Sequence, residues 1–406
     1  MQRSLNVTVD DKSWPKPPAL PAYPSSFGSS PQNWDVNIPS VLLAIGYLTT
    51  PSHSSGVSLS EFWAWVRYLH AISSSGSLRL TKAFNELDPH QKTILSDDFG
   101  MGMPVCWLLE KLNIGLLADG RYFVDRIASK VGATALKSKK RGPGKTPDFV
   151  ARDIYGVWHI LECKGTQTSP EYRRIQLGNA LPHPTGAVAQ KQTIVFPRGH
   201  TGQRLAAGLY IGVDGGAYDS SMHIIDPPPD DPFVVSDRNL ALADDAISRA
   251  VAARSLRLAG FAQASTAMSA PMGARPDTEP LKGKAEEARR EFVDEKRRQA
   301  AEELEARGDR TLFQSNGEKY RGRKVQIDLP SSISIGHRYA SSIVVRYGMG
   351  LSFLDELRRK PLVDNPIQEE IAAVRELQPG TKLDSDKRGA SLHIGKSFVA
   401  DIQFRS

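Results

Sequence analysis

The pattern of apolar and polar positions divides the chain into regions of different character. From about residue 38 to 92, apolar residues recur at three- and four-residue spacing, which predicts helices. Between 93 and about 232, helical and strand-like runs alternate, as is typical of an α/β unit. The polar, proline-rich stretch "DPPPDDP" at residues 226–232 is expected to end that unit.

The two ends of the chain differ from this middle region. Residues 1–37 are rich in Pro, Ser and Asn and poor in core-forming residues, so we expect an arm or a disordered lead. Residues 233–310 contain an alanine-rich helix, a linker, and a highly charged helix expected to be a solvated arm or half of a coiled-coil contact. Strand-like runs and a helix near 365–377 predict that residues 311–406 form a small C-terminal α+β domain.

The middle region is predicted to begin with a helix and three strands, followed by a second helix and a fourth strand. In chain order, these elements are expected at residues 97–113, 114–120, 147–153, 157–165, 186–194 and 206–214.

The second and third of these strands carry charge, for which a core strand has no packing use. Because side chains alternate across a sheet, Glu162 and Lys164 share one face while Cys163 points the other way. A turn at "DIYG", residues 153–156, would fold the two strands into an antiparallel hairpin, with Asp148 level with Glu162 or just beyond it. Two carboxylates and an amine are therefore expected at one end of the sheet.

Two converging carboxylates suit Mg²⁺ (or Mn²⁺), because magnesium takes one or two carboxylates together with waters and phosphate oxygens. Lys164 could orient or help deprotonate an attacking water and neutralise a phosphate. The alternative is that Asp148 caps a strand and Glu162 forms a surface salt bridge with Lys164. The tripeptide of an acid, any residue and a lysine also begins at Asp10 and Asp294, so only its context here is informative.

These residues resemble the signature of the PD-(D/E)xK nuclease superfamily, also called restriction-endonuclease-like. The matching residues are Pro147, Asp148, Glu162, Cys163 and Lys164. The resemblance covers roughly residues 93–215 and implies metal-dependent hydrolysis of a phosphodiester. It further implies that Asp148, Glu162 and the backbone carbonyl of Cys163 bind the metal, while Lys164 acts with the water.

The superfamily usually adds an acid on the helix before the first core strand, and here the candidates are Asp97, Asp98 and Glu110. Asp98 has helical spacing that places it at the head of the buried face, so it is favoured, with a helix N-cap as its alternative role. Many members also carry a glutamine or lysine on the helix after the motif. Gln190 and Lys191 are the candidates, although Gln190 could equally be a surface residue.

The net positive charge of the chain also favours nucleic acid as its ligand. The 52 Lys and Arg residues exceed the 45 Asp and Glu residues, which gives a formal charge of +7. Residues 129–146, immediately before the proposed site, contain basic residues and no acid. Lys139, Lys140, Arg141 and Lys145 are predicted to contact phosphates, unless this stretch is an ordinary solvated loop. Lys191, on the helix after the motif, is also predicted to bind nucleic acid.

The remaining composition excludes several classes of protein. The two cysteines, Cys106 and Cys163, do not allow a disulfide framework or a zinc cluster. No Walker loop or nucleophile elbow is present, so ATP-driven and serine-hydrolase chemistry are not indicated. No run approaches the roughly 20 apolar residues of a transmembrane helix, so we expect a cytoplasmic protein without membrane contact.

The sequence therefore predicts an α/β protein with a restriction-endonuclease-like mixed sheet flanked by helices, an N-terminal helical segment and a small C-terminal α+β domain. Its five regions are expected at residues 1–37, 38–92, 93–232, 233–310 and 311–406. The expected function is that of a Mg²⁺-dependent DNA endonuclease in prokaryotic anti-phage defence or restriction, acting as a homo-oligomer or with a defence-system partner protein. RNA stays open as a substrate. The alternative is a non-catalytic nucleic-acid-binding or scaffold subunit with a nuclease-like fold.

Overall fold

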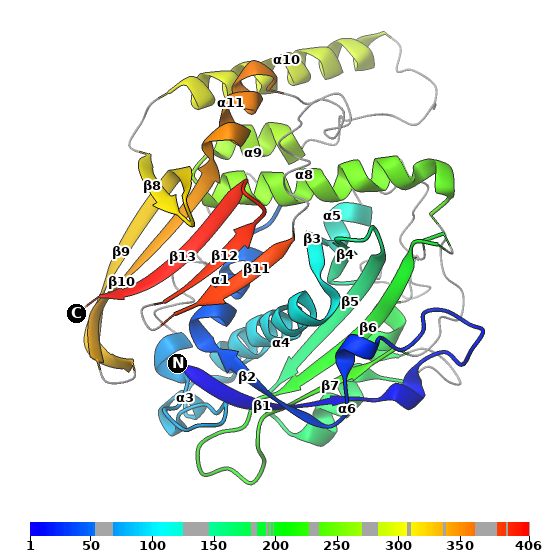
Figure 1. Cartoon of the computed structure of the whole chain (residues 1–406), viewed down its shortest axis with the longest axis vertical. Coiled ribbons are helices and arrows are strands. Elements are labelled where there is room, and N and C mark those ends of the chain that lie inside the picture. Colours follow the sequence, from blue (N-terminus) through cyan, green and yellow to red (C-terminus); the bar gives the residue numbers. More distant parts are fainter. Residues whose placement is uncertain are drawn as a thin grey trace.

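Figure 1 shows two β-sheets with helices between and around them. The computed structural model describes residues 1–52, 68–124, 146–179, 185–191, 194, 196, 197, 199–226, 235–269, 283–306, 310–335, 338–361, 380–386 and 389–405. Within these residues the chain is a mixed α/β protein, which confirms the predicted class.

The first sheet has seven strands in the order β2-β1-β7-β6-β5-β4-β3. β5 is parallel to β6 and β1 is parallel to β7, whereas the other neighbours are antiparallel. The central strands are buried on both faces, as their continuous apolar runs require. The strands are β1 (Gln2–Val9), β2 (Gln32–Asn37), β3 (Ile114–Asp119), β4 (Phe149–Asp153), β5 (Trp158–Thr166), β6 (Thr201–Tyr210) and β7 (Ser221–Ile225).

The first 37 residues are part of this sheet, so the prediction of an arm or a disordered lead is wrong. They contribute β1 and β2 and the short 3-10 helices η1 (Asp11–Ser13) and η2 (Ser25–Phe27). Trp14 and Phe27 are buried, and the Phe27 ring lies 4.8 Å from that of Trp107. The segment is too poor in apolar residues to form its own core, but it gains burial by packing on residues far along the chain.

Helices cover both faces of the seven-stranded sheet. α4 (Pro89–Leu112) packs on β5 and β6, and α1 (Ile38–Leu48) packs on α4. On the other side, α6 (Pro170–Leu177) and α7 (Gly186–Lys191) contact the same two strands. The short helices α3 (Lys82–Asn85) and α5 (Gly120–Tyr122) complete this part. The second helix predicted before residue 92 lies mostly outside the described residues.

A helical layer follows the first sheet. It begins with the 3-10 turn η4 (Asp237–Asn239) and contains α8 (Leu240–Leu258), α9 (Ala262–Ser269) and α10 (Lys284–Glu305). α10 packs on α9 and buries Val293, Ala300 and Leu304, so it is not a solvated arm. Its exposed face carries ion pairs within the helix, as its charge pattern indicates.

The C-terminal region forms a six-stranded antiparallel sheet in the order β11-β12-β13-β10-β9-β8, and its described residues also include α11 (Leu351–Arg359). This confirms the predicted α+β composition, while the helix predicted near 365–377 lies outside the described residues. The apolar face of the sheet packs on α1 through β12, and one hydrophobic core joins both sheets. The strands are β8 (Thr311–Ser315), β9 (Glu318–Ile335), β10 (Arg338–Gly350), β11 (Thr381–Ser385), β12 (Gly389–Ile394) and β13 (Phe398–Arg405).

The layers therefore run from the seven-stranded sheet through α4 and α1 to the six-stranded sheet (Figure 1). The predicted boundary at residues 226–232 lies almost entirely outside the described residues. No helix in the described ranges combines the length and the apolar character that crossing a membrane requires.

Candidate active site

The predicted hairpin is formed by β4 and β5. Phe149 pairs with Leu161, so the preceding residue, Asp148, stands level with Glu162. The turn is closed by Asp153, whose Oδ1 accepts the backbone N–H groups of Tyr155 and Val157 at 2.8 Å. The sequence prediction of an antiparallel pair with the two acids at its end is thus confirmed.

The two carboxylates at this end are fixed by each other's backbone. The Asp148 N–H donates to Glu162 Oε2 at 3.0 Å, and the Cys163 N–H donates to Asp148 Oδ2 at 2.8 Å. The side chain of each acid is therefore held by a backbone N–H group of the other half of the hairpin. This reciprocal bonding fixes the orientation of both groups without using side chains from elsewhere.

Lys164 closes the group. Its Nζ lies 2.5 Å from Glu162 Oε1, and 26% of its side chain is exposed, whereas the Glu162 side chain is fully buried. Glu162 and Lys164 are two residues apart on one strand and therefore share a face, as the alternation of a strand requires. Cys163 is buried on the opposite face.

The electrostatics of the site show a surplus of negative charge. Burial, together with the adjacent Asp148 carboxylate, raises the pKa of Glu162 to about 8. Burial also raises the pKa of Asp148. Burial alone would lower the pKa of Lys164, but the Glu162 carboxylate outweighs it and the pKa is raised. A second cation beside the two acids would relieve this cost.

α4 approaches this end of β5 at backbone distance. A Cβ placed on Gly165 would lie 1.7 Å from the Ser96 carbonyl oxygen, and one placed on Gly100 would lie 2.7 Å from the Gly165 Cα. The helix and the strand can approach this closely only because both residues are glycines, which have no Cβ atom. Asp97, the residue after Ser96, is thereby brought to the edge of the site.

The acid that acts on the site from this helix is Asp97 and not the favoured Asp98. Asp97 is exposed, its charge acts on Asp148, and burial raises its own pKa while Lys164 opposes the rise. Asp98 instead accepts a hydrogen bond from the Tyr68 hydroxyl at 2.5 Å. The helix begins at Pro89 and is capped by Asp88, so Asp98 is not its N-cap either. The close contact of Ser96 and Gly100 with Gly165 decides which helix residue lies at the edge of the site, and the sequence does not reveal that contact.

Glu110, the third candidate, lies near the far end of the same helix. Its Oε2 accepts the Trp34 indole N–H at 3.2 Å, next to β2. It therefore takes no part in the group around Glu162.

Lys191 is misassigned in the sequence prediction. Its side chain is fully buried, and its Nζ donates to Asp226 Oδ1 at 2.7 Å and to the Arg204 carbonyl oxygen. Burial lowers its pKa, and its charge is compensated inside the protein. A phosphate cannot reach it, because the apolar residues of the short helix α7 bring Lys191 inward with them.

Gln190 is half-buried on α7, which packs on β5 and β6. Its role stays a prediction. The predicted phosphate contacts Lys139, Lys140, Arg141 and Lys145 lie outside the described residues.

The donors that the resemblance implies for a metal are two carboxylates and one backbone carbonyl. In the described part of the chain, no three His, Cys, Asp or Glu side chains gather closely enough to hold a metal ion. Mg²⁺ does not need such a cage, because it keeps several waters and takes one or two carboxylates plus phosphate oxygens. Asp148, Glu162 and the Cys163 carbonyl therefore fit that ion in number and in chemistry.

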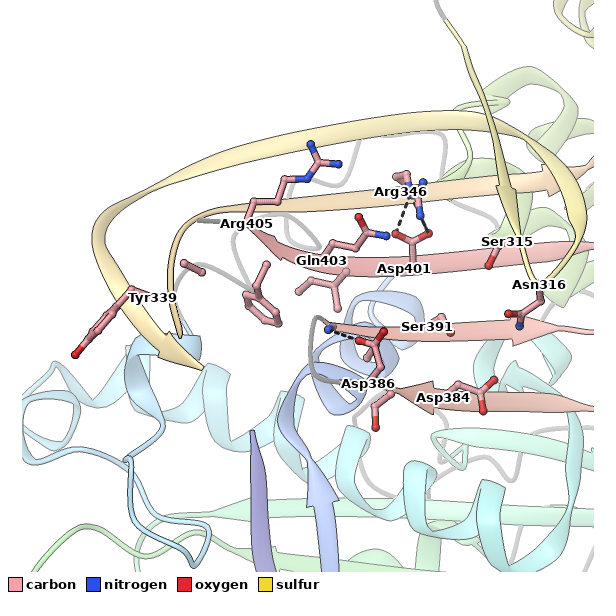
Figure 2. Close-up of a pocket in the computed structure, with 16 residues that line it drawn as sticks. Ser315, Asn316, Tyr339, Arg346, Asp384, Asp386, Ser391, Asp401, Gln403 and Arg405 are labelled. Carbon is pink, nitrogen blue, oxygen red and sulfur yellow. Dashed lines mark hydrogen bonds and ion pairs between the residues drawn. The ribbon is translucent and has the colours of Figure 1, made fainter. Parts of the chain in front are cut away.

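A separate hollow of about 800 Å³ lies on the polar face of the six-stranded sheet (Figure 2). Its floor is a row of cross-strand partners in which Asp401 stands between Arg346 and Ser391, and the Arg346 Nε bonds both Asp401 oxygens at 2.9 and 3.0 Å. Three aspartates and two arginines line it. This balance of charge does not suit a polyanion, so we do not assign the hollow to nucleic acid.

Comparison of the chain with models of protein families, with curated proteins and with solved structures gave no match in any of the three.

Proposed function

We propose that this chain is a metal-dependent nuclease that hydrolyses phosphodiester bonds of DNA, with Mg²⁺ or Mn²⁺ as its cofactor. One observation carries the proposal: Asp148 and Glu162 hold each other in place at a sheet end, with Lys164 bonded to Glu162. A structural salt bridge does not require a second, fully interlocked carboxylate beside it.

The order of elements supports the proposal. A helix carrying an acid, a strand, the acidic hairpin, the helices α6 and α7 and a strand parallel to β5 follow each other, and such a mixed sheet flanked by helices is what the resemblance implies. Asp97, whose charge acts on Asp148, would serve as the helix acid that this resemblance leads one to expect.

The cofactor would be held by Asp148, Glu162 and the carbonyl of Cys163. When bound, Mg²⁺ would polarise a phosphate oxygen and lower the pKa of a coordinated water. Because the pKa of Glu162 is raised to about 8, this residue must release a proton before it can act as a ligand at neutral pH.

Lys164 would supply positive charge. Its pKa is raised, so at neutral pH the amine is protonated and can donate hydrogen bonds but cannot accept a proton. It can therefore orient an attacking water and stabilise the charge that develops on the phosphate. Asp97, exposed beside it and with a raised pKa, is the better proton acceptor of the two.

Cleavage assays on the purified chain test the proposal. Wild-type protein should cut linear or circular DNA with Mg²⁺ or Mn²⁺ and stop when EDTA is added, while Asp148→Asn and Lys164→Met should lose the activity. Asp294→Asn and Lys296→Met are controls, because they make the same two replacements in the acid-x-lysine tripeptide on α10, away from the hairpin.

Equal cutting by wild type and the two site variants would refute the proposal. So would the absence of cutting on DNA and RNA with either metal, and the non-catalytic binding or scaffold role would then remain. If the activity serves defence against phage, wild type but not Asp148→Asn should reduce plaque formation when expressed in a bacterial host.

A further inference from the structure

The end of β3 contacts the proposed site directly. β3 is the last strand in the order of the seven-stranded sheet, and its Asp119 pairs with Phe149, the residue after Asp148. The N–H of Gly120 donates to the Asp148 carbonyl oxygen at 2.9 Å. A Cβ placed on Gly120 would overlap the Pro147 carbonyl oxygen, so the two backbones approach closely here. The end of β3 therefore holds the backbone of Asp148 from the side opposite to β5.

Helix α8 holds this end of β3 in turn. A strand at the edge of a sheet has a strand partner on one side only, and α8 packs on β3 (Figure 1). Arg254 of α8 is fully buried. Its Nη2 donates to Asp119 Oδ1 at 2.5 Å, its Nη1 to the Leu117 carbonyl oxygen at 3.3 Å, and its Nε to the Thr50 carbonyl oxygen at 2.9 Å. One guanidinium thus ties the end of β3 to the chain that follows α1.

The Asp119 carboxylate is the link between Arg254 and the site. Its Oδ2 accepts the Ser52 hydroxyl at 2.8 Å and the Ser52 N–H at 3.3 Å, so both of its oxygens are engaged. Asp119 is the last residue of β3, and the next N–H along the chain is the one that binds Asp148. A shift of Asp119 would therefore displace the group that holds Asp148.

A second arginine on α8 provides an internal comparison. Arg249 is also fully buried, and its Nε bonds both oxygens of Asp245 on the same helix, at 3.1 and 2.9 Å. Its Nη1 donates to the Met268 carbonyl oxygen in α9. These bonds of Arg249 lie within the helical layer, whereas those of Arg254 cross to the sheet.

We propose that Arg254 is a positioning residue for the metal site: through Asp119 it fixes the end of β3, and with it the Asp148 that would bind the metal. The inference rests on the proposed nuclease function. It makes α8, which follows the region that resembles a nuclease, part of the catalytic unit. Replacing a group that supports a metal ligand typically costs about 10- to 100-fold in metal affinity or activity.

Metal binding and hydrogen exchange of the full chain test this role. The affinity for Mn²⁺ is measured by calorimetry, and amide exchange is followed by NMR at Gly120 and Cys163, whose N–H groups hold Asp148. Arg254→Lys keeps the charge, but its single nitrogen cannot reach all three acceptors. It should weaken Mn²⁺ binding by roughly 10- to 100-fold and speed exchange at both amides. Asp119→Asn removes the same ion pair from its other partner and should have the same effects.

Arg249→Lys is the matched control. It makes the same replacement in an equally buried ion pair on the same helix, so it should lower the melting temperature to a similar extent. It should leave the Mn²⁺ affinity and the exchange at Gly120 and Cys163 as in wild type. If one of Arg254→Lys and Asp119→Asn does not fold, the other decides the result.

The inference is overturned if the folded Arg254→Lys or Asp119→Asn protein binds Mn²⁺ and exchanges as wild type does, or if Arg249→Lys causes the same losses. Arg254-dependent Mn²⁺ binding that Asp148→Asn abolishes, in a protein that never cuts, would refute the nuclease proposal alone. Metal-dependent cutting with no dependence of Mn²⁺ affinity on Arg254 would refute this inference alone. A wild type that binds no Mn²⁺ would overturn both.

Discussion

The contact between α4 and β5 makes Gly165 the most informative single residue to change. Gly165 follows Lys164, and its Cα faces the backbone of α4 at Ser96, the residue before Asp97. Replacing Gly165 with alanine adds one methyl group at the point where the helix and the strand meet. We expect the variant to lose stability and to separate Asp97 from Lys164.

The size of the effect follows from the distances. The new Cβ would lie 1.7 Å from the Ser96 carbonyl oxygen, whereas real Cβ atoms essentially never approach closer than about 3.0 Å. The backbones must therefore separate by about 1.3 Å. β5 is paired with strands on both sides, so α4 has to move. Overpacking of this kind costs about 1–3 kcal/mol and sometimes more.

The displacement should also reduce catalysis. A misplacement of about 1 Å can reduce the rate by on the order of 100-fold, even where the altered residue does not touch the substrate. Gly100→Ala forces the same two backbones apart from the other side, but by only about 0.4 Å, because its Cβ would lie 2.6 Å from the Gly165 N. The double variant should therefore cost less than the sum of the two single variants.

Urea denaturation and single-turnover DNA cleavage measure the two effects, with cleavage assayed at a temperature where each variant is folded. Gly199→Ala is the control, since its Cβ would meet nothing within 4 Å and its φ is not positive. It should stay within about 0.5 kcal/mol of wild type. A Gly165→Ala protein that is as stable and as active as this control would show that the close contact does not position the site.

Three further changes test the electrostatics. Because folding raises the Glu162 pKa from 4.5 to about 8, its ionisation costs stability, so wild type should lose up to about 5 kcal/mol of unfolding free energy relative to Glu162→Gln as pH rises through that window. Lys164→Arg should retain more cleavage activity than Lys164→Met, since charge and not proton transfer is needed. Lys191→Met should destabilise the protein by about 3–5 kcal/mol, because it leaves Asp226 buried without its partner.

Each of these three predictions is checked by its own measurement. Glu162→Gln is compared with wild type by urea denaturation in metal-free buffer at several pH values, and a difference that does not grow with pH contradicts the raised pKa. Equal activity of the two Lys164 variants would show that the positive charge of Lys164 is not needed for cleavage. Lys191→Met should also leave the salt dependence of DNA binding unchanged, and a lower salt slope would mean that Lys191 contacts phosphate after all.

The local features of the site could be predicted from the sequence. The alternation of side chains places Glu162 and Lys164 on one face, and the turn residues at 153–156 fix the register that sets Asp148 opposite Glu162. Both depend on residues close together in the chain. The helices and strands of the middle region were predictable for the same reason, because each is encoded in its own apolar pattern.

Long-range packing set the rest of the structure. Residues 1–37 join the sheet because β7, some 200 residues later, offers an edge for them to pair with, and no local pattern reveals that edge. The direction of Asp97 depends on where α4 touches β5, which the phase of the helix alone does not fix. The sequence around Lys191 suggests a surface cation, but in the structure Lys191 is buried and forms an ion pair with Asp226.

The sequence by itself therefore determined the hairpin, its two acids and its lysine, because short-range geometry is written in spacing and turn residues. Only the tertiary structure decided which helix acid lies near them and which lysine is buried. Each of these depends on contacts between segments that are distant in the chain. The free energy of such a contact depends on both segments, so the sequence of one segment does not reveal it.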